Sequence, residues 1–155
     1  PGDAGPFGAA GFSHLRVLQA AGAVNEVEQA RAFRAQRAAI DRVVGIAFET
    51  IGDWQLARFK RDSSNAGKVM QTGLWSLTRH PNYFGNALLW WGIGIVAAET
   101  GSGVIGFIGP VVMTYLLLKV SGVPMLEHSM NKRREGYAEY ATRTSVFIPR
   151  LPKKA

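Results

Sequence analysis

Cysteine is absent from this chain of 155 residues. Its absence excludes disulfide bonds, thiolate metal sites and cysteine nucleophiles. Histidine is scarce as well, because the chain has only His14, His80 and His128, which are too scattered to form a metal-binding motif. There is also no Gly-x-Gly-x-x-Gly that follows a strand, no P-loop and no His-Glu-x-x-His motif. We therefore expect no metal site.

Charge is nearly missing from one long part of the chain. Between Pro81 and Lys119 the only charged residue is Glu99, although the whole chain has a net charge of +7. The basic residues flank this apolar part on both sides. Such a distribution suits anionic lipid headgroups or a phosphate-bearing cofactor better than nucleic acid. We expect a lipid bilayer as a partner, and no nucleic acid.

The sequence before the apolar part predicts a long helix. Pro1–Gly11 is rich in glycine, proline and alanine, and we expect it to be poorly ordered. Asn25 followed by Glu28 resembles a helix N-cap with its acidic partner, so a helix is expected from about Glu26 to about Arg61. Serine, asparagine and glycine residues then predict a loop over Asp62–Gly73.

The apolar part predicts a helical hairpin. Proline disfavours the α conformation of the residue before it, so His80 should be extended and Pro81 should begin a helix that reaches about Ala98. A second apolar helix is expected from about Val104 to Val120, with a kink at Pro110. Each helix is near the lower limit of about 17 residues for crossing a bilayer. Two crossings place both basic tracts on one face, which the positive-inside rule makes cytoplasmic.

The tail completes the expected architecture. Pro124–Thr144 reads as one or two amphipathic helices, with a break at Gly136. The sequence therefore indicates an all-α integral membrane fold. It should combine a long helix on the cofactor side, a helical hairpin and a C-terminal amphipathic helix.

Two carboxylates lie on the apolar half of the long helix. Glu49 and Asp53 are four residues apart, so they share one helical face beside Phe48 and Trp54. Carboxylates are costly in lipid unless they face a polar cavity, which favours a cofactor-lining role. The alternative is that this end of the helix lies at the membrane interface and both acids pair with nearby Arg or Lys.

The RHPNYFG segment carries a second cluster. Arg79 can make a bidentate contact to phosphate or carboxylate, and His80 can donate a hydrogen bond or stack. Asn82 lies near a helix start, where free backbone N–H groups favour anions, and Tyr83 supplies a ring and a hydroxyl. The alternative is an ordinary basic anchor with a tyrosine at a membrane boundary.

The tail carries the third cluster. Glu127 follows the second apolar helix, while Tyr137, Tyr140 and Arg143 are spaced three residues apart on one face. Tyrosines and an arginine on one face can hold an adenosine-phosphate group. The alternative is an amphipathic helix that lies on lipid headgroups through the basic run 132–134.

Three segments resemble a known superfamily: ETIGDWQLARFK, NAGKVMQTGLWSLTRHPNYFGN and LLKVSGVPMLEHSMNKRREGYAEYATRTSVFIP. They are similar to the C-terminal part of bacterial membrane proteins related to steroid 5-alpha-reductase, in a superfamily that includes the isoprenylcysteine carboxyl methyltransferases. The resemblance covers roughly Val43 to Pro152. It implies a membrane-embedded reductase-like domain at residues 43–155, preceded by an atypical segment at residues 1–42 that is partly disordered or helical.

The resemblance also implies a nucleotide cofactor bound on the cytoplasmic side. That cofactor is NADPH in the reductases and S-adenosylmethionine in the methyltransferases. Carried over residue by residue, the cofactor contacts are Glu49, Asp53, Asn65, Lys68, Arg79, His80, Asn82, Tyr83, Glu127, Tyr137, Tyr140 and Arg143. The reductases usually have Glu at the position of Asn86. Their catalytic Glu and Tyr come from an N-terminal half that residues 1–42 do not resemble, so the catalytic residues stay unassigned.

The leading functional hypothesis is an NADPH-dependent oxidoreductase in the bacterial inner membrane, with its basic loops and C-terminus in the cytoplasm. It would reduce a carbon–carbon double bond conjugated to a carbonyl in a small hydrophobic, lipid or steroid-like substrate. One alternative is an S-adenosylmethionine-dependent carboxyl methyltransferase of the isoprenylcysteine type. Another is a truncated, non-catalytic membrane protein. The sequence gives neither the lipid substrate nor the oligomeric state.

Overall fold

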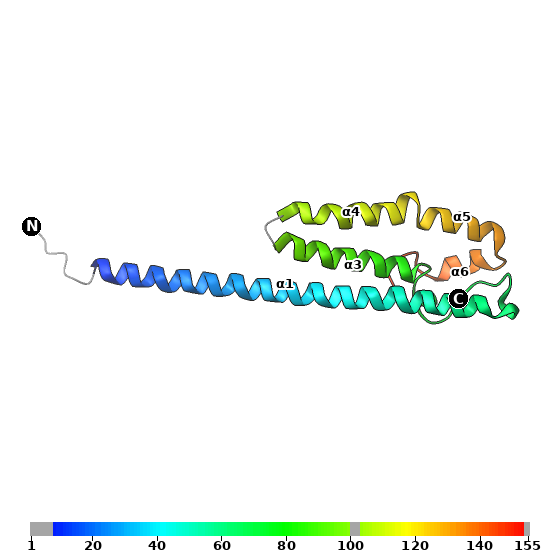
Figure 1. The fold of residues 1–155 in the computed structure, drawn as a ribbon, viewed down its shortest axis with the longest axis horizontal. Coiled ribbons are helices and arrows are strands. Elements are labelled where there is room, and N and C mark those ends of the chain that lie inside the picture. The colour runs from blue at the N-terminus through cyan, green and yellow to red at the C-terminus, as the bar shows by residue number, and fades with distance from the viewer. Residues whose placement is uncertain (1–7, 100–102, 154–155) are drawn as a thin grey trace, which may run out of the picture. The chain divides into compact units, whose positions relative to one another are not determined.

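A computed structural model describes residues 8–99 and 103–153 of the chain. These residues form helices joined by loops, with no β-strand among them, so the expected all-α class is confirmed (Figure 1). In chain order the elements are α1 (Gly8–Arg61), the 3₁₀ turn η1 (Ser63–Asn65), α2 (Leu74–Leu77), α3 (Pro81–Ala97), the 3₁₀ turn η3 (Gly103–Phe107), α4 (Ile108–Tyr115), the π-helical turn η4 (Leu116–Val120), α5 (Val123–Arg133) and α6 (Tyr137–Arg143).

The chain divides into two compact units, Pro1–Gln36 and Arg37–Ala155, and the boundary falls within α1. The first unit contains the N-terminal part of α1, whose described side chains are mostly exposed. Arg31 there pairs with Glu28 one turn away, at 3.1 Å. The second unit contains all the other helices and the site described below.

The expected start of the long helix at Glu26 is wrong. The helix α1 already begins at Gly8, so Asn25 lies in its interior, where its Oδ1 accepts a hydrogen bond from Nε2 of Gln29 at 3.2 Å. Alanine-rich sequence without proline favours an unbroken helix, and this outweighs a single cap-like residue. Residues 8–11 of the segment expected to be poorly ordered are helical, and residues 1–7 lie outside the described residues.

The predicted end of α1 at Arg61 is confirmed. The carboxylate of Asp62 accepts a hydrogen bond from the backbone N–H of Ser64 at 2.9 Å and starts the short turn η1. Gly67 and Gly73 have positive φ angles in the loop that follows. That loop leads to α2, a single helical turn that the sequence did not predict.

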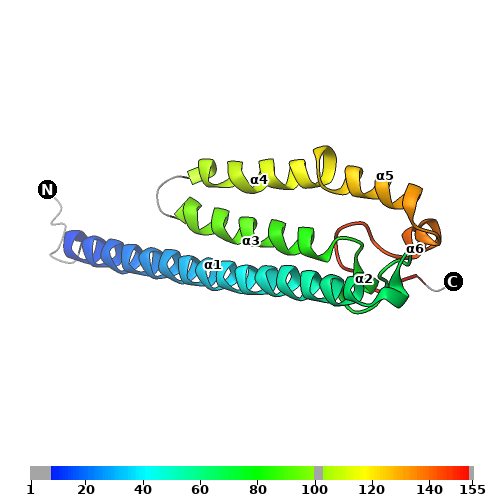
Figure 2. The ribbon, with the colours of Figure 1, turned by 45° about the vertical axis from the view of Figure 1, so that its right-hand side comes forward.

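The hairpin is formed by α3 and by the run from η3 to η4. Pro81 is the first residue of α3, as predicted, and His80 before it is non-helical, although its ψ of 63° is not the extended conformation expected. In both ribbon views α3 lies between the C-terminal part of α1 and α4 (Figures 1 and 2). The expected single helix over 104–120 is instead a succession of 3₁₀, α and π segments. Pro110 is the third residue of α4, where its missing N–H costs no helical hydrogen bond, so it starts this helix instead of kinking a longer one.

Small residues bring α1 and α3 into backbone contact. Ala38, Gly45 and Gly52 recur at seven-residue spacing on α1, and Gly85 and Gly92 do so on α3. A Cβ atom on Gly85 would lie 2.4 Å from the carbonyl oxygen of Gly45, and one on Gly92 would lie 2.8 Å from that of Ala38. These contacts leave no room for larger side chains, so the small residues fix the spacing of the two helices.

Large apolar side chains remain exposed on these helices. They lie on the second half of α1, on α3, and on the run from η3 to η4: Val43, Ile46, Trp54, Trp90, Trp91, Ile93, Val104, Ile105, Ile108, Val111, Val112, Tyr115, Leu116 and Val120. Among the described residues, one helical run, Gly103–Arg133, is long and apolar enough to cross a membrane by length and composition. The helix α3, with 17 residues, spans about 25 Å at about 1.5 Å per residue.

The C-terminal segment closes the end of the second unit where α3 begins. The backbone N–H of Arg79 donates to the carbonyl of Ser145 at 2.8 Å, and that of Arg150 donates to the carbonyl of Leu77 at 2.9 Å. Thr78 is fully buried, and its hydroxyl lies 2.9 Å from the carbonyl oxygen of Phe147. These contacts hold the turn before Pro81 in one conformation.

Candidate functional site

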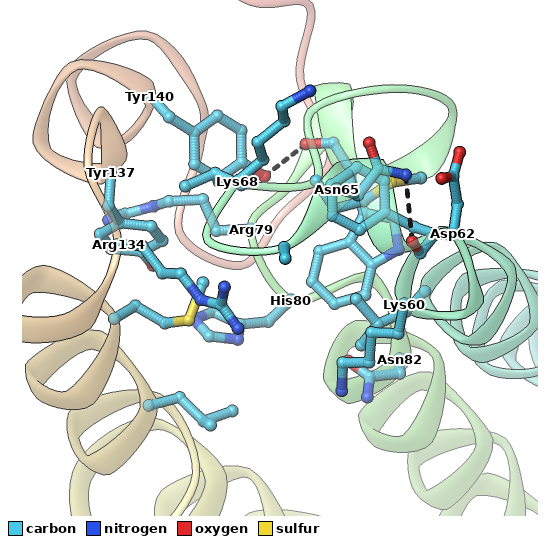
Figure 3. Close-up of a pocket in the computed structure, with 18 of the residues that line it drawn as sticks. Lys60, Asp62, Asn65, Lys68, Arg79, His80, Asn82, Arg134, Tyr137 and Tyr140 are labelled. Carbon is cyan, nitrogen blue, oxygen red and sulfur yellow. Dashed lines mark hydrogen bonds between the residues drawn. The ribbon is translucent and has the colours of Figure 1, made fainter.

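A pocket of about 320 Å³ lies at this end of the second unit. Its walls come from the end of α1, the loop 62–73, α2, the residues before and at the start of α3, α5 from Leu126 onward, and α6 (Figure 3). The lining residues are Leu56, Phe59, Lys60, Asp62, Ser63, Asn65, Ala66, Lys68, Val69, Met70, Trp75, Arg79, His80, Asn82, Leu126, Met130, Arg134, Tyr137 and Tyr140. The pocket therefore combines apolar, aromatic and basic groups.

Basic side chains outnumber acidic ones on the pocket wall. Lys60, Lys68, Arg79 and Arg134 line it against the single acid Asp62. Lys60, Lys68 and Arg134 form no salt bridge with any other described residue, and Figure 3 shows them reaching the pocket from three different elements. Lys68 also acts on the Asp62 carboxylate without forming a salt bridge with it. The excess of cations over acids around the cavity favours an anionic ligand, because such a ligand supplies negative charge.

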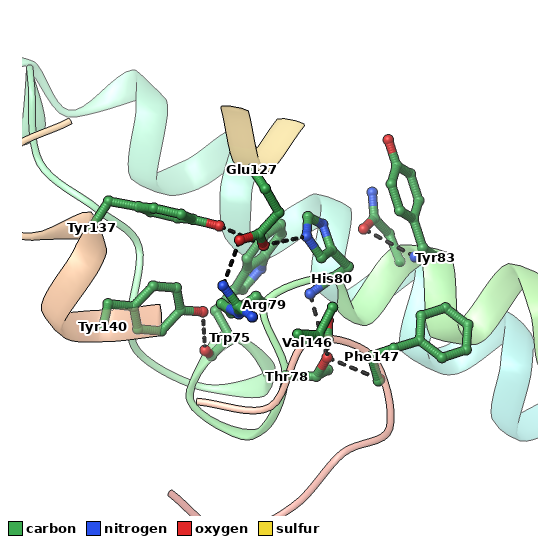
Figure 4. A network of polar contacts seen from close by, with 11 residues as sticks. Trp75, Thr78, Arg79, His80, Tyr83, Glu127, Tyr137, Tyr140, Val146 and Phe147 are labelled. Atoms are coloured by element: carbon green, nitrogen blue, oxygen red, sulfur yellow. Dashed lines mark hydrogen bonds and ion pairs between the residues drawn. The ribbon is translucent and has the colours of Figure 1, made fainter. Parts of the chain in front are cut away.

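The floor of the pocket is a buried polar network centred on Glu127 of α5 (Figure 4). One carboxylate oxygen, Oε2, accepts a hydrogen bond from Arg79. The other, Oε1, lies 2.9 Å from Nε2 of His80 and accepts a hydrogen bond from the Tyr137 hydroxyl at 2.7 Å. The side chains of Arg79 and His80 are 9% and 4% exposed. A buried ion pair of this kind contributes little net stability, so its presence is more informative about function than about folding.

Arg79 is therefore committed to Glu127 and is not a free cation. Its Nε is also buried and has no hydrogen-bond partner among the described residues. A buried N–H without a partner is costly, so a ligand oxygen placed beside this Nε would be stabilised. The three cations without salt bridges are better placed than Arg79 to take up the charge of a ligand.

The aromatic side chains of the pocket, Trp75 and Tyr140, are held by hydrogen bonds between side chains and backbone. The hydroxyl of Tyr140 donates to the carbonyl of Trp75, and Nε1 of Trp75 donates to the carbonyl of Gly52 at 3.0 Å. Oε1 of Gln55 accepts the N–H of Leu74 at 3.0 Å. These bonds fasten α2 to α1 and α6, so the short helix that the sequence did not predict is what positions Trp75.

Seven of the twelve residues predicted to bind a cofactor line this pocket: Asn65, Lys68, Arg79, His80, Asn82, Tyr137 and Tyr140. Glu127 lies beneath it as the partner of Arg79 and His80. Tyr83 stacks on His80 with ring centroids 5.4 Å apart, and Arg143 forms a salt bridge with Glu139 at 2.9 Å. The pocket also contains Lys60, Trp75 and Arg134, which the sequence did not single out as cofactor ligands.

The two acids of α1 pair with asparagines of α3. Nδ2 of Asn82 donates to Asp53 at 3.0 Å, and Nδ2 of Asn86 lies 3.5 Å from Glu49, one turn further along α3 and one turn back along α1. Neither acid lines the pocket. At Asn86, where the related reductases usually have Glu, the amide lies opposite Glu49. Two carboxylates at these positions would repel each other unless one were protonated.

The two buried tyrosines predict a distinct alkaline titration. Burial and the neighbouring Glu127 carboxylate raise the pKa of Tyr137, and burial raises the pKa of Tyr140, both well above the usual value of about 10. Because these pKa values are higher in the folded than in the unfolded protein, the stability they contribute is complete below about pH 10 and is lost as the pH rises further.

The absorbance of tyrosinate, recorded during an alkaline titration, measures this effect. Two of the four tyrosines should ionise late, with or after unfolding. Tyr137→Phe and Tyr140→Phe should each remove part of the late phase. A single phase near pH 10 for all four tyrosines would contradict this environment.

Comparison with known families places the chain in one of them. The family described as a protein of unknown function, DUF1295, matches residues 15–144, and the chain therefore belongs to it. This family is related to the steroid 5-alpha-reductases and the isoprenylcysteine methyltransferases. No curated protein and no solved structure matches the chain.

Proposed function

We propose that this member of the DUF1295 family is a membrane-bound, NADPH-dependent reductase of an enone in a hydrophobic substrate. The observation that carries the proposal is the pocket, in which unpaired cations and aromatic rings share a cavity with apolar side chains. The cations can bind the phosphate groups of a nucleotide, and the aromatic and apolar side chains can pack against its flat ring systems.

The exposed apolar surface of the second unit supports a membrane location. Unpaired apolar side chains cover the hairpin and the adjoining part of α1, while Lys60, Lys68 and Arg134 meet at one end. Apolar helices with basic residues gathered at one end fit a bilayer with that end in the cytoplasm. Close helix packing through Gly45 and Gly85 is also common between membrane helices.

The residues present fit NADPH. Lys60, Lys68 and Arg134 would hold its phosphate groups, and Trp75 and Tyr140 would border its rings. A second cavity of about 320 Å³ shares Phe59, Asp62, Asn65 and Met70 with the first, which suits an elongated ligand. When bound, NADPH would supply a hydride to the substrate.

The substrate would approach from the apolar side of the pocket. Leu126 and Met130 of α5 line this side, and Met125 beside them is 65% exposed. A hydrophobic molecule dissolved in the bilayer could thus reach the polar pocket without crossing water. The protein's part in the reaction would be to orient the double bond, exclude water and deliver a proton.

A methyltransferase using S-adenosylmethionine is the second candidate, because the family is related to both enzyme classes. This cofactor carries no phosphate. The excess of cations over acids on the pocket wall therefore favours NADPH.

Binding measurements separate these candidates. We expect NADPH to quench the tryptophan fluorescence of the protein in nanodiscs, and S-adenosylmethionine to compete weakly or not at all. Loss of one charge-assisted hydrogen bond costs about 1.5–3 kcal/mol, so Lys68→Ala and Arg134→Ala should each weaken NADPH binding about tenfold or more. Higher salt should reduce the difference in NADPH affinity between the wild type and these two variants.

Lys132→Ala is the matched control, since Lys132 is exposed on α5 and does not line the pocket. It should leave NADPH affinity unchanged. Tighter binding of S-adenosylmethionine, insensitive to Lys68 and Arg134, would replace the reductase with the methyltransferase. Intact NADPH affinity without turnover of any enone would point to a non-catalytic protein.

A further inference from the structure

We propose that His80, held in one tautomer by Glu127, is the group that protonates the substrate. The inference rests on the proposed reductase function and goes beyond it. The reduction of an enone needs a proton as well as a hydride, and the resemblance leaves the source of that proton unassigned in this chain.

The contacts of Glu127 fix where the ring proton of His80 lies. An ionised carboxylate only accepts hydrogen bonds, and Glu127 already accepts them from Arg79 and Tyr137. The 2.9 Å contact to Nε2 of His80 therefore requires a hydrogen on Nε2. Nδ1 is left as the atom that gains and loses a proton, and it has no hydrogen-bond partner among the described residues. His80 lines the pocket, and Nδ1 is the ring nitrogen that Glu127 does not engage.

No other group on the pocket wall is as well suited to deliver a proton near neutral pH. Arginine does not deprotonate in proteins. The Tyr137 hydroxyl donates to Glu127, and the Tyr140 hydroxyl donates to the carbonyl of Trp75. The raised pKa values of both tyrosines make them weaker acids than usual. The pKa of Asp62 is lowered by its hydrogen bonds with Ser64, so it carries no proton to give. Histidine is the side chain that ordinarily exchanges a proton in this range.

The lysines of the wall are the remaining donors. Lys60 and Lys68 are exposed ammonium groups at the rim, whereas the His80 ring is 4% exposed at the floor. Amines with a reference pKa of about 10.4 hold their proton tightly. Their unpaired charges also suit them to bind an anion, which would be lost if they gave up the proton.

Charged and titratable groups from each neighbouring element act on His80. Glu127 of α5 contacts Nε2 of the ring, Arg79 binds the other oxygen of the same carboxylate, and Arg134 lines the same pocket. Tyr83 of α3 stacks on the ring at an interplanar angle of 8°, and Tyr137 of α6 shares the Glu127 oxygen. The arrangement resembles the carboxylate–histidine pairs in which the acid sets the tautomer and orientation of the imidazole.

The proposed step balances as follows. A hydride adds to the β-carbon, and the π electrons of the carbon–carbon double bond move toward the carbonyl to give an enolate. The α-carbon then takes the proton from Nδ1 of the doubly protonated His80, so that a C–H bond forms and an N–H bond breaks. Neutral His80 keeps its Nε2 proton facing Glu127, and a proton from solvent restores Nδ1. NADPH, a proton and the enone become NADP⁺ and the saturated ketone.

The first test reads the tautomer without any turnover. Nitrogen-15 histidine spectra of the ligand-free protein in nanodiscs should show His80, assigned by its loss in His80→Asn, as the tautomer with hydrogen on Nε2. Glu127→Gln should change the tautomer or mix both forms, because the neutral amide can present either its oxygen or its N–H to Nε2. A neutral His80 ring with its hydrogen on Nδ1 and none on Nε2 would overturn the proposal.

The second test measures turnover of NADPH with the 3-oxo-4-ene steroid progesterone as the probe. General acid catalysis contributes about 10²–10⁴-fold, so His80→Asn should lower kcat by about that factor, whereas Lys68→Ala should act mainly on NADPH affinity. His128→Asn is the matched control, because His128 adjoins Glu127 in sequence but is exposed and outside the pocket. Asparagine is a good helix N-cap, so it suits the position of His80 before α3.

The outcomes separate this inference from the proposed function. Turnover retained in His80→Asn would overturn the role of His80 alone. If the wild-type protein binds NADPH but does not turn over the probe, both the reductase function for this substrate class and the proton role fail. A loss of kcat in both His80→Asn and His128→Asn would indicate general damage and would also overturn the assignment.

Discussion

Replacing Glu127 with alanine is expected to destabilise the second unit by about 3–5 kcal/mol. The variant leaves the guanidinium of Arg79, 9% exposed, without its counter-charge and removes the acceptor of the His80 and Tyr137 hydrogen bonds. An unpaired buried charge is penalised far more than the intact pair is rewarded. The measurement is denaturant unfolding of the detergent-solubilised protein, followed by circular dichroism.

Glu139→Ala is the matched control for this effect. Glu139 also pairs with an arginine, at 2.9 Å from Arg143, but its side chain is 72% exposed. Exposed pairs contribute about 0–1 kcal/mol, so this variant should be close to wild type. Combining Glu127→Ala with Arg79→Met should recover part of the loss, because the stranded charge is then gone. Equal effects of Glu127→Ala and Glu139→Ala would show that the network is not buried as described.

Gly85→Val is expected to cost about 3 kcal/mol, at the upper end of the range for overpacked sites. Its Cβ would lie 2.4 Å from the carbonyl oxygen of Gly45 and 2.6 Å from the backbone nitrogen of Glu49. Both are backbone atoms, so no side chain can rotate away and the two helices must separate. Thermal and denaturant unfolding in detergent would measure the loss.

Gly109→Ala provides the comparison. A Cβ atom there meets only the Trp90 ring, at 3.5 Å, which is an ordinary van der Waals distance. Since alanine favours helix over glycine by about 1 kcal/mol, this variant should be neutral or slightly stabilising. Tolerance of valine at Gly85 would mean that α1 and α3 are not in backbone contact.

Most helices could be predicted from the local sequence. Pro81 and the breakers after Arg61 set helix ends that do not depend on distant contacts, so both boundaries were predicted. The start of α1 was not, because the N-cap signature at Asn25 competes with an alanine-rich stretch whose helix propensity extends on both sides. The change from 3₁₀ to α to π geometry along 103–120 also escaped prediction, since these forms share one apolar pattern.

The site was less accessible to sequence reasoning. Arg79, His80 and the tail tyrosines could be nominated because polar and aromatic groups clustered at the edges of apolar segments. Lys60 and Arg134 could not, since each stands in a basic run whose members differ only in the direction they face. Trp75 depended on a helix of four residues that is fixed by bonds to Gln55 and Gly52.

The sequence by itself determined the helical class, the apolar hairpin and the basic ends, because composition and helix breakers act over a few residues. Only the tertiary structure decided what each polar residue does. It paired Arg79 with Glu127, 48 positions away, and it joined Asn82 to Asp53, 29 positions away. It thereby linked residues expected to touch a cofactor to one another as well as to the pocket, and it left Lys60, Lys68 and Arg134 without salt bridges. The role of each polar residue depends on which charges the fold brings together and buries, and the spacing of residues along the chain does not determine this.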